Sequence, residues 1–331
     1  MAVSPRPHLR GLRRAQHGGF HDPGRRVLDF SVNTNPFGPP PEVLKAFQTA
    51  DVTRYPDPEA LDLRKAIAKR HGVGTESILP GNGSVDLIWL TAAAYLEPGR
   101  SAYSCRPTFG EYEAAARAAD ATIAEALAGA TVAFLCNPNN PTGTLRPAGD
   151  IRREASAHPD TLLVVDEAYL PFTCAASCLD GGLMENLVVL HSLTKDCAIP
   201  GLRLGYAVGP PEVIQALRSV QPPWSVNAPA QAAGIAALAS AHRVPDLTPA
   251  KEYLTSSLTA LGLEVLPSET NFFLVHVRNG AGFRAALLEH DICVRDCASF
   301  GLPEHIRIGV RTHPDCEQLV TAVGKVLKHA C

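Results

Sequence analysis

Short apolar runs alternate with helix-like stretches through the middle of the chain, and this alternation constrains the fold more than any other feature. The runs that indicate buried strands are Ser101–Ser104, Thr131–Cys136, Leu162–Val165, Leu187–Leu190 and Leu204–Val208. Helical periodicity lies between several of them, at Glu111–Ala119, Pro147–Ala157 and Glu212–Val220. Short apolar strands bounded by helices are typical of a mainly parallel sheet that helices cover on both faces. The sequence therefore predicts an α/β fold built on such a sheet.

Three consecutive strands of this predicted sheet end in polar residues. The endings are Asn137–Gly143, Asp166–Tyr169 and Ser192–Lys195. In open parallel sheets, ligands bind at the carboxyl ends of the strands. An acid directly after an apolar run can be a plain helix cap, but three such endings in a row favour one shared site.

Lys195 leaves the strand 187–190 among hydroxyl residues, and Arg203 follows it between small and apolar neighbours. Burial favours the neutral form of a lysine, and the neutral amine can attack a carbonyl carbon. An ordinary lysine in a surface turn is the alternative interpretation. The polar endings of the neighbouring strands favour the nucleophile.

A run of small residues, Gly81-Asn82-Gly83-Ser84, precedes an apolar helix that we expect over Val85–Leu96, with Ser84 as its N-cap. Free backbone N–H groups at such a helix start can bind a phosphate. A capped turn without a ligand is the commoner meaning of a lone match of this kind. No Gly-x-Gly-x-x-Gly follows a strand, which disfavours a dinucleotide-binding fold.

Composition excludes several classes of protein. A net charge of −3 argues against nucleic-acid binding through bulk electrostatics. The sequence has no run of eighteen apolar residues, so we expect no membrane span. The nine cysteines are scattered without paired CxxC spacing, which suits reduced thiols in a cytoplasmic protein and disfavours zinc, so we expect no metal. Residues 1–16 are basic and lack a secretory apolar core, and we expect a loose tail there.

The pattern changes after about Pro245. Alternating helices and strands are predicted at Pro249–Leu261, Asn271–Val277, Phe283–His290, His305–Gly309 and Pro314–Lys328. A chain of 331 residues is long enough for two domains. We therefore expect an N-terminal tail and arm at 1–40, a large cofactor-binding domain at 41–244 and a smaller α+β domain at 245–331.

The polar groups at the predicted sheet edge together suit pyridoxal 5′-phosphate. Lys195 would bind its aldehyde, and Asp166 would keep its pyridine nitrogen protonated, so that the ring can accept electrons. Asn140 and Tyr169 would bond the ring oxygen, and Phe109 would stack on the ring or, alternatively, serve as a core aromatic. The phosphate would be held by Gly83, Ser84, Ser192, Thr194 and Arg203.

The sequence resembles a fold-type I pyridoxal-phosphate enzyme of the class I/II aminotransferase superfamily. The matching motifs are SVNTNPFGPP, RYPDP, GNGSVD, RPTFGEYE, CNPNNPTG, VVDEAY, HSLTK, GLRLGY and HIRIGV, which span nearly the whole chain after residue 17. The nearest groups are threonine-phosphate decarboxylase of cobalamin biosynthesis and histidinol-phosphate aminotransferase. A shortened piece at 120–130, between segments that usually carry an extra strand and helix, departs from the family pattern.

The resemblance implies further residue roles. Tyr55 would reach the cofactor phosphate of the other subunit, so a homodimer is expected. Arg307 would bind the substrate carboxylate, or alternatively pair with an interior acid, and Asn35 would lie in the arm that covers the substrate. His17, in a His-Gly-Gly run, would suit a substrate phosphate or be a plain loop residue.

The same resemblance leaves the reaction open. His17-Gly18-Gly19 and Arg311 after the strand at 305–309 favour the decarboxylase of a phosphorylated amino acid, and an aminotransferase is the alternative. A non-catalytic cofactor-sensing domain is a rival from another class, although no DNA-binding segment is recognisable before residue 17. An NAD-binding protein is disfavoured by the missing glycine motif.

Overall fold

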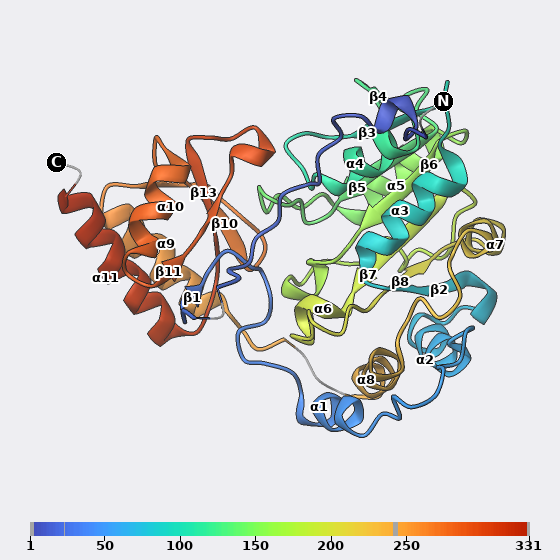
Figure 1. The fold of residues 1–331 in the computed structure, drawn as a ribbon, viewed down its shortest axis with the longest axis horizontal. Helices are drawn as coiled ribbons and strands as arrows, with labels where there is room; N and C mark the ends of the chain where they lie inside the picture. The colour runs from blue at the N-terminus through green and yellow to red at the C-terminus, as the bar shows by residue number, and fades with distance from the viewer. Residues whose placement is uncertain (1–2, 23, 241–243, 330–331) are drawn as a thin grey trace.

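The larger part of the protein is built around a seven-stranded mixed sheet (Figure 1). The computed structural model describes residues 3–22, 24–240 and 244–329. The strand order is β2 (Ile78–Gly81), β8 (Gly205–Val208), β7 (Leu187–Ser192), β6 (Leu162–Asp166), β5 (Val132–Cys136), β3 (Ser101–Ser104) and β4 (Thr122–Ala124). Strand β8 is antiparallel to both neighbours, and every other pairing is parallel. The predicted α/β fold with a mainly parallel sheet is thus confirmed.

Helices cover both faces of this sheet because its strands are apolar on both sides. In β6, Val164 packs with α3 (Ser84–Tyr95), α4 (Glu111–Ala118) and α7 (Pro211–Ser219). Its neighbours Leu163 and Val165 point to the opposite face, toward α5 (Ala148–Ala157). Beside them, a further cluster joins β2 and β8 to α1 (Pro41–Gln48), α2 (Leu61–His71) and α8 (Ala228–Ala239). Every residue of β6 is therefore buried.

A second sheet is built from the C-terminal third of the chain. Its order is β12 (Arg295–Asp296), β13 (His305–Gly309), β10 (Phe272–His276) and β9 (Glu264–Val265), and all its pairings are antiparallel. The helices α9 (Thr248–Ala260), α10 (Gly280–Leu288) and α11 (His313–His329) pack with it. A separate core is the physical basis of the small domain, and the boundary at 244 stays a prediction.

The N-terminal arm contacts both parts of the molecule. Strand β1 (Leu28–Asp29) pairs with β11 (Ile292–Cys293), and Phe30 is fully buried in the core of the small domain. Earlier in the arm, the turn at Pro7–Leu9 lies against α4, where His8 contacts the carbonyl of Ala118. The expectation of a loose tail was wrong for this part, because these residues have partners on α4 and do not extend freely into solvent.

Two local expectations also fail. Helix α3 begins at Ser84 and its N-cap is Gly83, whose φ of 84° lies in a region that a serine rarely adopts. Ser84 makes no capping hydrogen bond with its side chain, which lines a cavity instead. The short piece at 120–130 keeps a strand, β4, paired in parallel with β3 at the edge of the sheet. A strand of only three residues gives too little periodicity to reveal it from the sequence.

Along the part of the chain that the structure describes, no helix combines the length and the apolar character that crossing a membrane requires. The eight cysteines within this part carry free thiols. Five of them are buried, and burial raises the pKa of one of these, Cys178, to about 12.

Two histidines and a tyrosine form an uncharged polar cluster between β7, β8 and α2. His71 Nε2 lies 3.0 Å from the Tyr206 hydroxyl, and the His191 ring stacks on Tyr206 at 4.9 Å. Burial lowers the pKa of His71 to about 4 and that of His191 to about 3. Both imidazoles are therefore neutral in the folded protein at neutral pH, whereas in the unfolded chain they bind protons near pH 6.5.

Stability should consequently fall in acid. Between pH 6.5 and about 4 the unfolded chain binds more protons at these two sites than the folded protein does, so the free energy of unfolding decreases as the pH falls. The loss from His71 alone should be on the order of 2 to 3 kcal/mol. Urea titrations of the wild type and of His71→Gln at several pH values measure it. Equal pH slopes for the two proteins would refute this explanation.

Candidate active site

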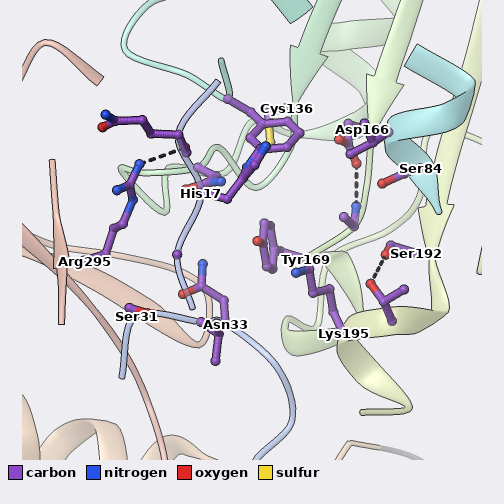
Figure 2. A pocket seen from close by; sticks show the side chains of 18 of the residues that line it. His17, Ser31, Asn33, Ser84, Cys136, Asp166, Tyr169, Ser192, Lys195 and Arg295 are labelled. Atoms are coloured by element: carbon purple, nitrogen blue, oxygen red, sulfur yellow. Dashed lines mark hydrogen bonds between the residues drawn. The ribbon is translucent and has the colours of Figure 1, made fainter. Parts of the chain in front are cut away.

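A cavity of about 610 Å³ lies where the carboxyl ends of β5, β6 and β7 face the small domain and the N-terminal arm (Figure 2). It brings together most of the residues that the sequence predicted. Those lining it are His17, Ser84, Phe109, Asn140, Asp166, Tyr169, Ser192, Thr194, Lys195, Arg203 and Arg307. The rule that parallel strands present their carboxyl ends at one edge therefore located this cavity.

Lys195 stands in α6 (Leu193–Asp196), the single turn that follows β7. Its Nζ lies 6.0 Å from the centre of the Tyr169 ring. Burial lowers the pKa of Lys195 to about 8, the positive charges of Arg307 and Arg203 act in the same direction, and Asp166 opposes them. A lysine of this pKa is partly neutral near physiological pH, which an amine nucleophile requires.

Asp166 ends β6 and is enclosed by donors. Its Oδ2 accepts a hydrogen bond from the Tyr112 hydroxyl at 2.9 Å, and its Oδ1 accepts one from the backbone N–H of Ala168 at 3.0 Å. Burial raises the pKa of Asp166, whereas these two bonds and the charge of Lys195 lower it. A cationic N–H partner in the cavity would stabilise the carboxylate further.

Tyr112 was not singled out from the sequence. It stacks on Phe134 with ring centres 5.2 Å apart and is fully buried on α4. The available signal was its spacing of three residues from Phe109, which places both rings on one side of the chain as α4 begins. Phe109 lines the cavity and meets Tyr112 edge to face.

Three elements meet to form a cradle of donors. The first turn of α3 supplies Ser84, the last residue of β7 is Ser192, and α6 supplies Thr194, whose hydroxyl lies 2.7 Å from that of Ser192. A Cβ on Gly83 would lie 2.5 Å from Arg203 Nη2, so this glycine lets the guanidinium approach the start of the helix. Backbone N–H groups, hydroxyls and a guanidinium are the donors that a phosphate monoester needs, so the cradle fits the phosphate of a cofactor.

We expect Gly83→Ala to weaken cofactor binding by at least about tenfold. The new methyl would displace Arg203, and alanine would be strained at a φ of 84°. Fluorescence titration of the cofactor-free protein with pyridoxal phosphate measures the effect. Gly99→Ala is the matched control, since Gly99 also has a positive φ of 90° but nothing lies near its absent Cβ. Equal losses for both variants would assign the effect to backbone strain alone.

Two arginines of the small domain reach the cavity side by side. Arg295 on β12 is paired directly with Arg307 on β13, and both are buried. Arg307 donates to Asn140 Oδ1 at 2.5 Å and to the Ser31 carbonyl at 2.7 Å. Its Nε is buried and has no hydrogen-bond partner among the described residues, which include no carboxylate paired with it.

Arg295 was missed by sequence reasoning because β12 has only two residues, and only its pairing with β13 brings it to the cavity. Its Nη2 donates to the Gln16 carbonyl at 2.8 Å and to Ser299 Oγ at 2.6 Å. Its nearest acid oxygen, on Asp296, is 3.9 Å from Nη1. Opposed like charges destabilise a strand pair, so a bound anion would stabilise this arrangement.

Two predicted site residues lie elsewhere. Asn35 does not line the cavity: its backbone N–H and its Nδ2 bond the carbonyls of Lys195 and Asp196, so it supports the lysine from behind. Asn33, two residues earlier in the arm, faces the cavity in its place. Tyr55 is 81% exposed and stacks on Trp224 at 4.7 Å, away from the cavity of its own chain.

Within the described residues, no group of three or more His, Cys, Asp or Glu side chains is arranged to hold a metal ion. The site instead combines a buried lysine of lowered pKa, a buried acid and a cradle of donors that fits a phosphate, all at the end of a parallel sheet. Such a set defines a pyridoxal-phosphate-dependent enzyme of fold type I, and the residues present fit that cofactor.

Comparison with known proteins agrees. The protein belongs to the aminotransferase class I and II family, whose sequence model matches residues 25–323. It is 37% identical to a histidinol-phosphate aminotransferase of Symbiobacterium thermophilum, over 93% of this chain and 92% of the relative. It is 33% identical to histidinol-phosphate aminotransferase 2 of Pseudomonas aeruginosa, over 92% of this chain and 90% of that one.

Two solved structures are also similar. Histidinol-phosphate aminotransferase of Sinorhizobium meliloti in complex with pyridoxal 5′-phosphate superposes with a TM-score of 0.87 at 25% identity, covering 100% of this chain and 99% of that one. L-Threonine-O-3-phosphate decarboxylase of Porphyromonas gingivalis superposes with a TM-score of 0.83 at 30% identity, covering 91% of this chain and 100% of that one. The cofactor of this enzyme is therefore pyridoxal phosphate.

Proposed function

We propose that this pyridoxal-phosphate enzyme decarboxylates a phosphorylated amino acid, with O-phospho-L-threonine as its substrate. The cofactor supplies an electron sink for the negative charge left at Cα. Lys195 would hold the cofactor and carry a proton to and from the substrate carbon, and Asp166 would hold the pyridine nitrogen in its protonated form. Loss of carbon dioxide breaks the bond from Cα to the carboxylate, and a proton takes its place.

The remaining groups of the cavity would position the cofactor. Ser84, Ser192, Thr194 and Arg203, with the Gly83 backbone, would bind its phosphate. Asn140 accepts a hydrogen bond from Arg307 on its Oδ1. Its Nδ2 is therefore left to donate to the ring oxygen of the cofactor, together with the Tyr169 hydroxyl. Phe109 would cover one face of the ring.

The single observation that carries the proposal of a substrate with both a carboxylate and a phosphate is the pair of opposed arginines, Arg295 and Arg307. Two buried guanidinium groups, one of them without any carboxylate partner among the described residues, suit a small substrate with two anionic groups. O-Phosphothreonine carries both a carboxylate and a phosphate. Arg307 would bind the carboxylate, and Arg295 with His17 would bind the phosphate.

The test is to incubate the cofactor-loaded enzyme with O-phospho-L-threonine and to measure carbon dioxide and the phosphorylated amino alcohol. We expect release of both in equal amounts. Conversion of the cofactor to its amine form by glutamate, without gas release, would reject the decarboxylase.

Arg295→Met should separate the roles of the two arginines. Because one charged hydrogen-bond partner of the substrate phosphate is lost, KM for O-phospho-L-threonine should rise by about tenfold or more. KM for unphosphorylated L-threonine, which we expect to react slowly, should stay within about twofold. A rise of equal size for both substrates would contradict a phosphate role for Arg295.

Histidinol-phosphate aminotransferase is the second candidate, and the 37% identity to a relative of that name favours it. Such an enzyme would use the same arginines for the glutamate carboxylates and for the phosphate of histidinol phosphate in turn. Production of glutamate from histidinol phosphate and 2-oxoglutarate would support this alternative.

We also propose that the enzyme is a homodimer in the cytoplasm. Val52, Tyr55 and Trp224 are large apolar side chains exposed at 72%, 81% and 45%, and Phe37 nearby in the chain is exposed at 54%. Surfaces of this kind are typical of subunit interfaces. Tyr55 would there reach the cofactor phosphate of the partner subunit, and Tyr55→Phe should weaken cofactor binding without dissociating the dimer.

A further inference from the structure

Glu111 is a buried acid next to the cavity, and it is not one of the residues that we propose to bind the cofactor. It is the first residue of α4, and both of its carboxylate oxygens have partners. Oε1 lies 2.7 Å from His17 Nε2, and Oε2 accepts a hydrogen bond from Trp89 Nε1 at 2.7 Å. The hydrogen bond to His17 is the main cause that lowers the pKa of Glu111. The carboxylate therefore joins the N-terminal arm to α3 and α4.

This contact fixes the orientation of His17. Its Nε2–H donates to Glu111 Oε1, so Nδ1 is the ring nitrogen left for a ligand, and in the imidazolium form of the ring its N–H can donate to an anion. The ring packs against Phe109 at 5.6 Å and lines the cavity. The side chain is half exposed, so packing alone does not hold the ring in this position.

The backbone of the arm places His17 and Arg295 on the same wall. The guanidinium of Arg295 donates to the carbonyl of Gln16, the residue before His17. A Cβ on Gly18 would lie 2.3 Å from the Ser31 carbonyl, so the arm folds tightly on itself immediately after His17. Figure 2 shows His17 and Arg295 on the side of the cavity away from Ser84 and Ser192, which belong to the predicted cradle for the cofactor phosphate.

We propose that Glu111 is a positioning residue for the substrate: it holds His17 so that Nδ1 meets the substrate phosphate beside Arg295. The inference rests on the proposed function in one respect, that the substrate carries a phosphate group. Glu111 does not touch the reacting atoms, and it acts only through His17. Trp89 keeps the carboxylate in place from the other side.

The decisive experiment is a double-mutant cycle of Glu111→Gln and His17→Ala in the cofactor-loaded enzyme. Kd for O-phospho-L-threonine and for inorganic phosphate is measured by calorimetry, alongside kcat and KM. Glu111→Gln should raise Kd for both phosphate-bearing ligands by about tenfold, as expected for one charge-assisted contact, and leave kcat within about twofold. In the His17→Ala background it should change nothing further.

Glu113→Gln is the matched control. Glu113 lies on the same helix but pairs with Arg106 and Arg117 on the surface, so its loss should not affect Kd. Independent, additive effects of Glu111→Gln and His17→Ala would overturn the inference, and so would an equal rise of KM for L-threonine. Failure to release carbon dioxide, with the coupling in Kd intact, would instead reject the decarboxylase and leave the role of Glu111 standing.

Discussion

Replacing Lys195 with alanine should reduce kcat by a factor on the order of 10⁴ or more, because the enzyme would lose the group that we propose as both nucleophile and proton carrier. The cofactor should still bind, held by the cradle around Ser84, Ser192 and Arg203. Reduction of the loaded wild type with borohydride, followed by peptide mapping, should find the cofactor attached at Lys195. Attachment at any other residue would contradict the site.

Lys251→Ala is the control for this variant. Lys251 is also a partly buried lysine whose pKa is lowered by burial, but it lies on α9 and donates to the Ser268 carbonyl, outside the cavity. It should retain full activity. The pH dependence adds a second check: the pKa of Lys195 is lowered to about 8, so the rate at which the cofactor-free enzyme attaches the cofactor should rise with pH and level off above about 8. A midpoint above pH 10 would mean that Lys195 is solvated.

Asp166→Asn should reduce kcat on the order of 10³, because a neutral amide cannot balance the charge of a protonated pyridine nitrogen. The amide oxygen can still accept the hydrogen bond of the Ala168 N–H, and the amide NH2 can donate to the Tyr112 hydroxyl oxygen, so the fold should be kept. Tyr112→Phe removes one of these bonds and should cost only about tenfold. Steady-state kinetics and the absorption spectrum of the bound cofactor measure both variants.

Glu167→Gln provides the comparison, because it changes the next residue in the chain. Glu167 is fully buried on the other side of the strand, where it accepts hydrogen bonds from Ser177 Oγ at 2.6 Å and from the Cys178 N–H at 2.8 Å. Its loss should lower the melting temperature and leave kcat within about twofold. If Glu167→Gln reduced kcat as strongly as Asp166→Asn, the assignment of Asp166 as the partner of the pyridine nitrogen would be wrong.

The centre of the site could be predicted from the sequence because its residues follow apolar strands directly. Lys195, Asp166 and Asn140 each come within a few residues of a strand end, and parallel strands bring such ends to one edge whatever the loops do. Arg203 could also be predicted, because it comes shortly after Lys195 in the chain and stands between small and apolar neighbours. Local patterns were sufficient for these groups.

The rest depends on contacts between distant segments, and the sequence carries little signal for it. Arg295 reaches the cavity only through the pairing of a two-residue strand, and Tyr112 through packing under Asp166. In the extended arm, Asn33 and Asn35 are equivalent by residue type, and hydrogen bonds to the backbone of α6 decide that Asn35 turns away from the cavity. Whether carbon dioxide or a proton leaves Cα depends on geometry finer than any of these patterns.

One consequence concerns movement between the two domains. Leu28, Asp29 and Phe30 are held in the small domain through β1 and its core, whereas Asn35 is bonded to the backbone of Lys195 and Asp196. Only the short peptide 31–34 separates these anchors, and Ser31 and Asn33 within it face the cavity. Any rotation of the small domain would therefore pull directly on the backbone of Lys195, so that domain closure and the position of the Lys195 amine would be mechanically coupled.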